Sequence, residues 1–168
     1  MADALPDILA EHLSVIFCGI NPAATAAAAG HSFVSPSNRF WRALHLAGFT
    51  PVQLRPQDDA TLVKYGYGLT AAVSRPTRSA SDLSRGELVA AGAALEARIS
   101  RYAPRFVAFL GKPAYAAIAG KAEIPWGPQS DRFGGASVWV LPNPSGLNRA
   151  FTLEALVEAY RSLRLALD

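Results

Sequence analysis

The sequence predicts a single three-layer α/β/α domain with a mainly parallel central sheet, spanning residues 1–168. Short runs rich in β-branched and aromatic residues alternate with longer helical patterns, which is the arrangement of βαβ units. The chain has 168 residues, of which 51% are hydrophobic and 17% are charged. These values suit one folded domain with a buried core.

The N-terminal part of the chain supplies two strands and two helices. The apolar run Leu13–Ile20 predicts the first strand, and Tyr67–Val73 predicts the second. Between them, the alanine-rich segment after Pro22 is expected to be a loop. Ser35 followed by Pro36 then predicts a helix start, with serine as the cap and proline in the first turn. This helix is expected to continue to a glycine stop, and another is expected to follow Pro56.

A long amphipathic helix is expected after the second strand. Ser84 and Glu87 have the spacing of a capping box, in which each side chain bonds the backbone N–H of the other. The apolar residues that recur on one face of this helix are Leu88, Leu95, Ile99 and Tyr102. Pro104 is expected to end it.

The C-terminal part supplies the remaining strands and helices. Arg105–Gly111 and Ser137–Leu141 predict strands, and Lys112–Ala119 predicts a short alanine-rich helix. Thr152 is expected to cap the last helix. Its predicted buried stripe is Leu153, Leu156, Val157, Tyr160 and Leu163, and its predicted exposed face carries Glu154, Glu158, Arg161 and Arg164.

Composition argues against several classes of protein. No apolar run approaches the roughly 20 residues of a membrane-spanning helix. The N-terminus lacks the basic start and apolar core of a secretory signal, so we expect a cytoplasmic protein, nucleoid-associated if bacterial, that does not contact a membrane. Cys18 is the single cysteine, and the scattered histidines lack ligand spacing, so no metal is expected. A net charge of +3 is compatible with a polyanionic partner but does not establish one.

Four polar or glycine-containing segments follow the predicted strands: "GINPAAT", "SRPTRSASD", "GKPAY" and "PNPSGLNR". In a parallel sheet these segments meet at one edge, where ligands bind. Asn21-Pro22 and Asn143-Pro144 are the most informative pairs, because Asn-Pro holds asparagine in an extended backbone and projects its amide from a strand end. Either pair alone is a common turn, whereas two at strand ends favour a site.

Together, four motifs resemble the mismatch-specific uracil-DNA glycosylases, which include the thymine-DNA glycosylases within the wider uracil-DNA glycosylase superfamily. The motifs are "FCGINP" at Phe17–Pro22, "NRFW" at Asn38–Trp41, "LGKPAY" at Leu110–Tyr115 and "VLPNPSGLNR" at Val140–Arg149. The resemblance implies a uracil-DNA glycosylase-like fold. It also implies a monomeric, cofactor-free enzyme whose partner is double-stranded DNA containing a mispaired or damaged base.

The activity implied by the resemblance is hydrolysis of the N-glycosidic bond of uracil, and of thymine or ethenocytosine, mispaired with guanine. The base is flipped out of the stack and an abasic site is left for base excision repair. In this family the asparagine matching Asn21 orients the attacking water, and the aromatic residue matching Phe33 stacks on the flipped pyrimidine. Backbone N–H groups around Ile20 and Ala23, together with Asn143, are expected to bind the base.

The resemblance also assigns residues that contact DNA outside the base pocket. Leu147 is the expected wedge, Gly146 and Arg149 are expected to bond the widowed guanine, and Asn148 is expected to take part in reading the opposite base. Lys112 and Ser145 are the expected phosphate contacts, although plain solvation is the commoner role of such a lysine. Three positions depart from the usual pattern and leave the range of damaged bases and the opposite-base preference open: Ala23 for glycine, Ala26 for serine and Asn148 for serine.

Asp82 is expected near the same edge, where a carboxylate could stabilise the oxocarbenium or accept the water's proton. A favourable charge at a helix N-terminus is the commoner reason for such an acid. Arg75 and Arg78 would add basic surface. Two other functions remain as alternatives: a non-catalytic module that binds nucleotides or damaged DNA, and a calcium-dependent nucleoside hydrolase, for which the sequence lacks the clustered aspartates.

Overall fold

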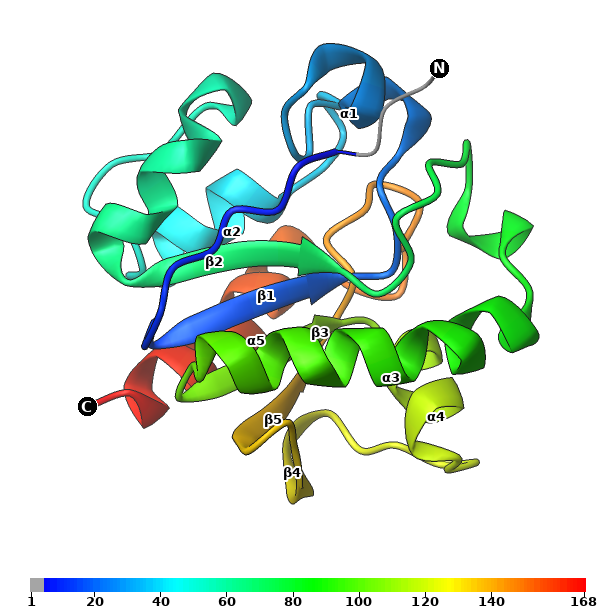
Figure 1. Cartoon of the computed structure of the whole chain (residues 1–168). Coiled ribbons are helices and arrows are strands. Elements are labelled where there is room, and N and C mark those ends of the chain that lie inside the picture. Colours follow the sequence, from blue (N-terminus) through cyan, green and yellow to red (C-terminus); the bar gives the residue numbers. More distant parts are fainter. Residues whose placement is uncertain (1–4) are drawn as a thin grey trace.

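A five-stranded sheet in the order β2-β1-β3-β5-β4 forms the centre of the computed structural model, which describes residues 5–168 (Figure 1). Its strands are β1 Val15–Gly19, β2 Tyr67–Ala71, β3 Phe106–Leu110, β4 Gly127–Phe133 and β5 Ala136–Leu141. All neighbouring pairs are parallel except β4 and β5, which are antiparallel. The predicted α/β class with a mainly parallel sheet is confirmed.

The edge strand β4 was not predicted. Its sequence, GPQSDRF, is largely polar and only Phe133 is buried, so it lacks the apolar run that marked the other strands. The strand pairs with β5, and a tight turn at Gly134 and Gly135 connects the two strands. Both glycines have positive φ angles, 56° and 83°. Pro128 is tolerated because the strand lies at the sheet edge.

The helices are α1 Ala24–Ala29, α2 Phe40–Leu46, η1 Pro56–Tyr65, η2 Ala80–Asp82, α3 Arg85–Tyr102, α4 Lys112–Ala119 and α5 Leu153–Ala166. Three predicted starts are confirmed by local geometry. The Ser84 hydroxyl accepts a hydrogen bond from Glu87 N at 3.1 Å, and the Thr152 hydroxyl accepts one from Ala155 N at 3.1 Å. The helix α4 has the predicted bounds.

Two local predictions are wrong. The helix expected to start at Ser35 begins instead at Phe40. Residues 35–38 form a turn, closed by a bond from Asn38 N to Ser35 O. Asn38 Oδ1 accepts a hydrogen bond at 2.9 Å from Phe40 N, the first N–H of the helix. The alanine-rich segment expected to be a loop forms α1, which a left-handed glycine, Gly30, ends.

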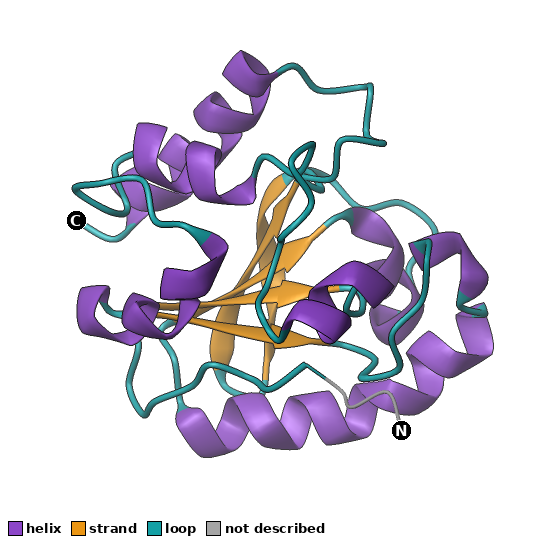
Figure 2. Ribbon diagram, turned by 90° about the horizontal axis from the view of Figure 1, so that it is seen from above, coloured by secondary structure: helices purple, strands orange, loops and turns teal. Residues whose placement is uncertain are grey.

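Helices cover both faces of the sheet, as Figure 2 shows. Alternate residues of β1 point to opposite sides: Val15 and Phe17 belong to the core beneath α2 and α5, whereas Ile16 and Cys18 belong to the core beneath α3. Burial raises the pKa of the Cys18 thiol to about 12, so this cysteine stays a protonated core residue, as its place in an apolar strand predicts.

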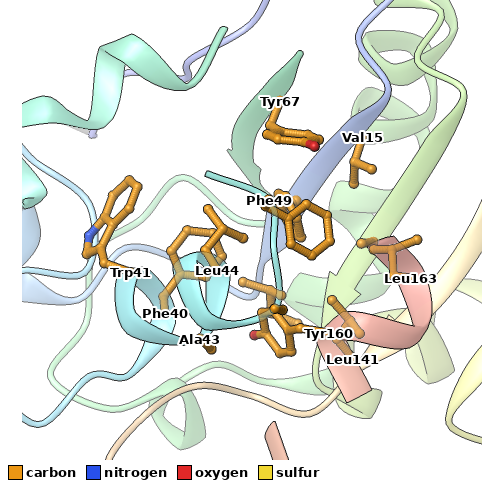
Figure 3. Packing of buried hydrophobic residues seen from close by; sticks show 14 of the residues in the cluster. Val15, Phe40, Trp41, Ala43, Leu44, Phe49, Tyr67, Leu141, Tyr160 and Leu163 are labelled. Atoms are coloured by element: carbon orange, nitrogen blue, oxygen red, sulfur yellow. The ribbon is translucent and has the colours of Figure 1, made fainter. Parts of the chain in front are cut away.

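The core beneath α2 and α5 is rich in aromatic rings (Figure 3). The Phe17 ring lies edge-on to Phe40 and to Phe49, with centroids 5.5 Å apart in both pairs. Each fully buried ring contributes roughly 1.5–3 kcal/mol through the apolar area removed from water. This rigid layer extends to Phe33, which packs on Phe40 beside the carboxyl ends of the strands.

Candidate active site

A cavity of about 380 Å³ lies beyond the carboxyl ends of the parallel strands. Its walls come from the segments that follow β1, β2 and β5, together with residues 32–35 before α2. These are segments far apart in sequence that Figure 1 shows gathered on one side of the sheet. The volume lies within the roughly 300–1,000 Å³ of small-ligand sites.

Most of the predicted site residues meet in this cavity. It is lined by Ile20, Asn21, Ala23, Phe33, Asn143, Ser145, Leu147 and Asn148. The predicted residues outside its lining are Asp82, Lys112, Gly146 and Arg149. The two Asn-Pro pairs therefore reach one cavity from the ends of β1 and β5.

Hydrogen bonds fix the orientation of the Asn21 amide. Its Nδ2 donates to Arg75 O and to Thr77 Oγ1, both at 2.8 Å. A backbone carbonyl can only accept, and the Thr77 hydroxyl gives its single proton to Ser79 O at 2.7 Å, so both neighbours require a donor from Asn21. The nitrogen must therefore face them, and Oδ1 is left as an acceptor that no described residue occupies.

The segment after β2 supports the Asn21 loop through its backbone as well. Thr77 N donates to Pro22 O at 3.1 Å, and Ala24 N donates to Thr77 O at 2.8 Å. Thr77 was not predicted as a site residue. It stands within the "SRPTRSASD" segment, but its contact with Asn21 joins residues 56 apart and has no local signature.

Phe33 presents one face of its ring to a supporting ring. It stacks on Phe40 with centroids 4.3 Å apart and an interplanar angle of 30°. Its φ of 56° is left-handed, a conformation that costs a residue with a side chain roughly 1–3 kcal/mol. The surrounding contacts offset this strain and hold the ring in the cavity wall.

Asn143 contributes a second oriented amide. Its Oδ1 accepts a hydrogen bond from Ser145 N at 2.9 Å, which leaves Nδ2 as the donor. The residue is half-buried and lines the cavity at the end of β5. A donor from Asn143 and an acceptor from Asn21 therefore border the same space.

The loop after β5 is held by Arg39, which belongs to the "NRFW" motif before α2. Its guanidinium donates to the carbonyl oxygens of Pro144, Ser145, Asn148 and Phe151, at 2.5 to 3.4 Å. The planar guanidinium group of Arg39 therefore bonds the backbone at both ends of the loop. The sequence showed an arginine beside an aromatic pair, but gave no sign of its four carbonyl partners.

The tip of this loop projects an apolar side chain into solvent. Leu147 is 79% exposed. Gly146 lies against the turn before α2, where an added Cβ would be 2.6 Å from Ser37 Cβ and 2.8 Å from Ser37 O. Arg149 is exposed and has no hydrogen bond or ion pair among the described residues.

Asn148 uses its amide inside the loop. Its Nδ2 donates to Asn143 O at 2.9 Å, and its Oδ1 accepts from Ala150 N at 3.3 Å. These bonds brace the loop from within. Asn148, which replaces the usual serine, therefore stabilises the loop through both groups of its amide.

Basic groups beside the cavity differ in how they are neutralised. Arg75 pairs with Glu87 at 2.7 Å, and the pairing lowers the pKa of that carboxyl, so Arg75 adds little free positive charge. Arg78 is exposed and lines the cavity. The Lys112 ammonium lies over the Trp126 ring, 4.3 Å from its centroid, and forms no ion pair among the described residues.

Carboxylates are nearly absent from the described cavity wall. Asp82 is exposed, accepts a hydrogen bond from Ser79 N at 3.2 Å, and caps η2. Asp7 lines the cavity, but its carboxylate accepts from the Thr70 hydroxyl at 2.9 Å. Residues 5–168 contain no cluster of three metal-ligating side chains, and no helix within them is long and apolar enough to span a membrane.

Comparison with known proteins agrees with this geometry. A family model described as the uracil DNA glycosylase superfamily matches residues 6–164. A solution NMR structure from Methanosarcina acetivorans, described as a candidate uracil DNA glycosylase, is similar in fold with a TM-score of 0.63. That similarity covers 97% of this chain and 98% of the other, at 19% sequence identity.

Proposed function

The chain belongs to the uracil-DNA glycosylase superfamily, and we propose that within it the protein is a monofunctional, mismatch-specific enzyme. It excises uracil mispaired with guanine, and also thymine or ethenocytosine in that pairing. Superfamily membership supports hydrolysis of an N-glycosidic bond in DNA. The proposal adds the mismatch preference and the roles of individual residues.

One observation carries the proposal: the Asn21 amide is oriented with its oxygen unoccupied, in the wall of a cavity that Phe33 also borders. A flipped pyrimidine stacks on the free face of Phe33, a contact that contributes roughly 1–3 kcal/mol per base. A water molecule donates a hydrogen bond to Asn21 Oδ1. This bond holds the water with a lone pair of its oxygen directed at the sugar.

The reaction needs little more than this arrangement. As the glycosidic bond lengthens, the sugar gains oxocarbenium character and the base leaves as an anion. Asn143 Nδ2 and backbone N–H groups around Ile20 and Ala23 donate to the base oxygens and stabilise the charge. The water oxygen bonds C1′ of the sugar as the bond from C1′ to the base breaks. Because an amide can hold water but cannot take its proton, that proton passes to solvent or to the departing base anion, and turnover is expected to be modest.

The loop after β5 contacts the DNA duplex around the flipped nucleotide. Leu147 fills the gap left by the flipped nucleotide, and Gly146 and Arg149 bond the pairing edge of the widowed guanine. Lys112 and Ser145 contact phosphates. Because the Asn148 amide is used within the loop, Arg149 and the backbone carry the opposite-base preference.

The enzyme acts as a cytoplasmic monomer without cofactor or metal. Free-base release from a duplex panel tests the function. Duplexes carrying U:G, T:G, ethenocytosine:G or U:A, and a single strand carrying uracil, are incubated with excess protein, with and without chelator. We expect uracil to leave U:G fastest, chelator to have no effect, and strands to break only after alkali.

Two results would contradict parts of this proposal. Tight binding of U:G duplexes without release of any base would identify a non-catalytic binding module. Release at equal rates from U:G, U:A and single strands would leave a uracil glycosylase but remove its mismatch preference.

A further inference from the structure

We propose that Asp59 is a positioning residue for the base-stacking ring, acting through the backbone of Ser32. This inference rests on the proposed function, in which Phe33 stacks on the flipped base. Asp59 lies in η1, outside the cavity lining. It therefore acts at a distance from the base, through the peptide that precedes Phe33.

Asp59 is a buried acid with a specific backbone partner. The residue is 6% exposed, and its Oδ2 accepts a hydrogen bond from Ser32 N at 3.0 Å. Burying a carboxylate is costly unless its oxygens are bonded. Its other contact, His31 Nδ1 to Oδ1, is longer at 3.4 Å and involves a side chain that is 39% exposed. The Ser32 amide is therefore the principal partner.

The peptide units around Ser32 are held from both sides. While Asp59 accepts from its N–H, the indole Nε1 of Trp41 donates to its carbonyl oxygen at 3.1 Å. The next residue is Phe33, which has a left-handed φ of 56° and stacks on Phe40. Two anchors directly before a strained residue fix where its ring points.

Fixing the ring before DNA arrives has a consequence for catalysis. A ring that is already placed gains the full stacking contact when the base enters, whereas a mobile ring must first lose conformational freedom. Loss of the Asp59 acceptor should therefore loosen residues 31–33 in the free protein and slow base excision. The Asn21 amide, held by other residues, should stay in place.

The test compares Asp59→Ala, Asp59→Asn and Asp58→Ala with the wild type. Asp59→Ala removes the acceptor, and Asp59→Asn keeps one amide oxygen while removing the charge. Asp58→Ala is the matched control, because its carboxylate binds Arg55 in the same turn of η1 without contacting Ser32. Hydrogen exchange of residues 31–33 is measured in the free protein, and uracil excision in single turnover at saturating enzyme.

We expect Asp59→Ala to raise exchange at the Ser32 amide at least tenfold and to lower the excision rate about tenfold. Asp59→Asn should recover the excision rate to within about threefold of wild type, and Asp58→Ala should match wild type in both measurements. Equal exchange and excision in Asp59→Ala and wild type would overturn the inference, as would the same losses in Asp58→Ala.

Trp41→Phe covers the case in which Asp59→Ala does not fold. It removes the opposite anchor of the same residue and should increase exchange and slow excision; unchanged values would overturn the inference. Failure of the proposed function is recognised separately. If the wild type releases no base from any duplex, that function fails, while hydrogen exchange still decides whether Asp59 holds the loop.

Discussion

The orientation of one amide decides what Asn21 can do. The hydroxyl of Thr77 has only one proton and gives it to Ser79 O, so it must accept from Asn21 Nδ2. This relay of hydrogen bonds, from Asn21 Nδ2 to the Thr77 hydroxyl and from that hydroxyl to Ser79 O, points Asn21 Oδ1 away from Thr77 and leaves it free to accept from water. Residue 77 thereby controls a side chain 56 positions earlier in the chain.

We predict that Thr77→Val slows uracil excision about tenfold in single turnover, because one of two bonds that orient the Asn21 amide is lost. Thr77→Ser, which keeps the hydroxyl, should retain most of the rate. Affinity for a U:G duplex should change little in both variants. A wild-type excision rate in Thr77→Val would show that the relay is not needed.

Most of the predicted site residues line the cavity, but the motifs did not predict which residues hold them in place. Asn21 and Asn143 stood out because Asn-Pro follows a strand end, a signal that is local in sequence. Thr77, Arg39 and Asp59 act through contacts between distant segments, and a single sequence carries no mark of such contacts. Asp82, predicted near the edge, caps η2 instead of lining the cavity.

Elements whose ends are set by local chemistry were predicted well. The Ser84 cap of α3 and the Thr152 cap of α5 form as expected, since each depends on side chains within one helical turn. The start of α2 was misplaced because residues 35–38 form a turn, and Asn38 Oδ1, not the Ser35 hydroxyl, accepts from the first N–H of the helix. The edge strand β4 was missed because its pairing with β5, and not an apolar pattern, makes it a strand.

The start of α2 and the loop after β5 behave as one unit through Arg39. We predict that Arg39→Lys weakens binding of U:G duplexes and slows excision about tenfold, because an ammonium cannot bond four carbonyl oxygens arranged around a planar fork. Arg42→Lys, an exposed position one turn further along α2, is the control and should match wild type. Equal activity of Arg39→Lys and wild type would contradict this role.

At the scale of the whole molecule, the net charge of +3 matters less than where free cations lie. Arg75 is neutralised by Glu87, whereas Arg78 lines the cavity and Lys112 lies over Trp126 without an ion pair among the described residues. Net charge alone could not separate these cases. Arg78 and Lys112 therefore place positive charge that no ion pair neutralises, among the described residues, on the side of the sheet that carries the cavity.

We predict that affinity for DNA falls steeply between low and moderate salt, since each neutralised phosphate releases counterions. Lys112→Ala should lower the slope of log K against log salt by about 1, and Lys64→Ala, an exposed lysine in η1, should leave the slope unchanged. Affinity that does not vary with salt, or equal slopes for Lys112→Ala and wild type, would count against the assigned phosphate contact.

The most direct measurement is single-turnover release of uracil from a U:G duplex by wild type and Asn21→Ala, with duplex affinity measured in parallel. We predict that wild type releases free uracil and that Asn21→Ala binds the duplex with similar affinity but releases uracil at least about a hundredfold more slowly. Release by Asn21→Ala at the wild-type rate would contradict the assignment of the water-positioning amide.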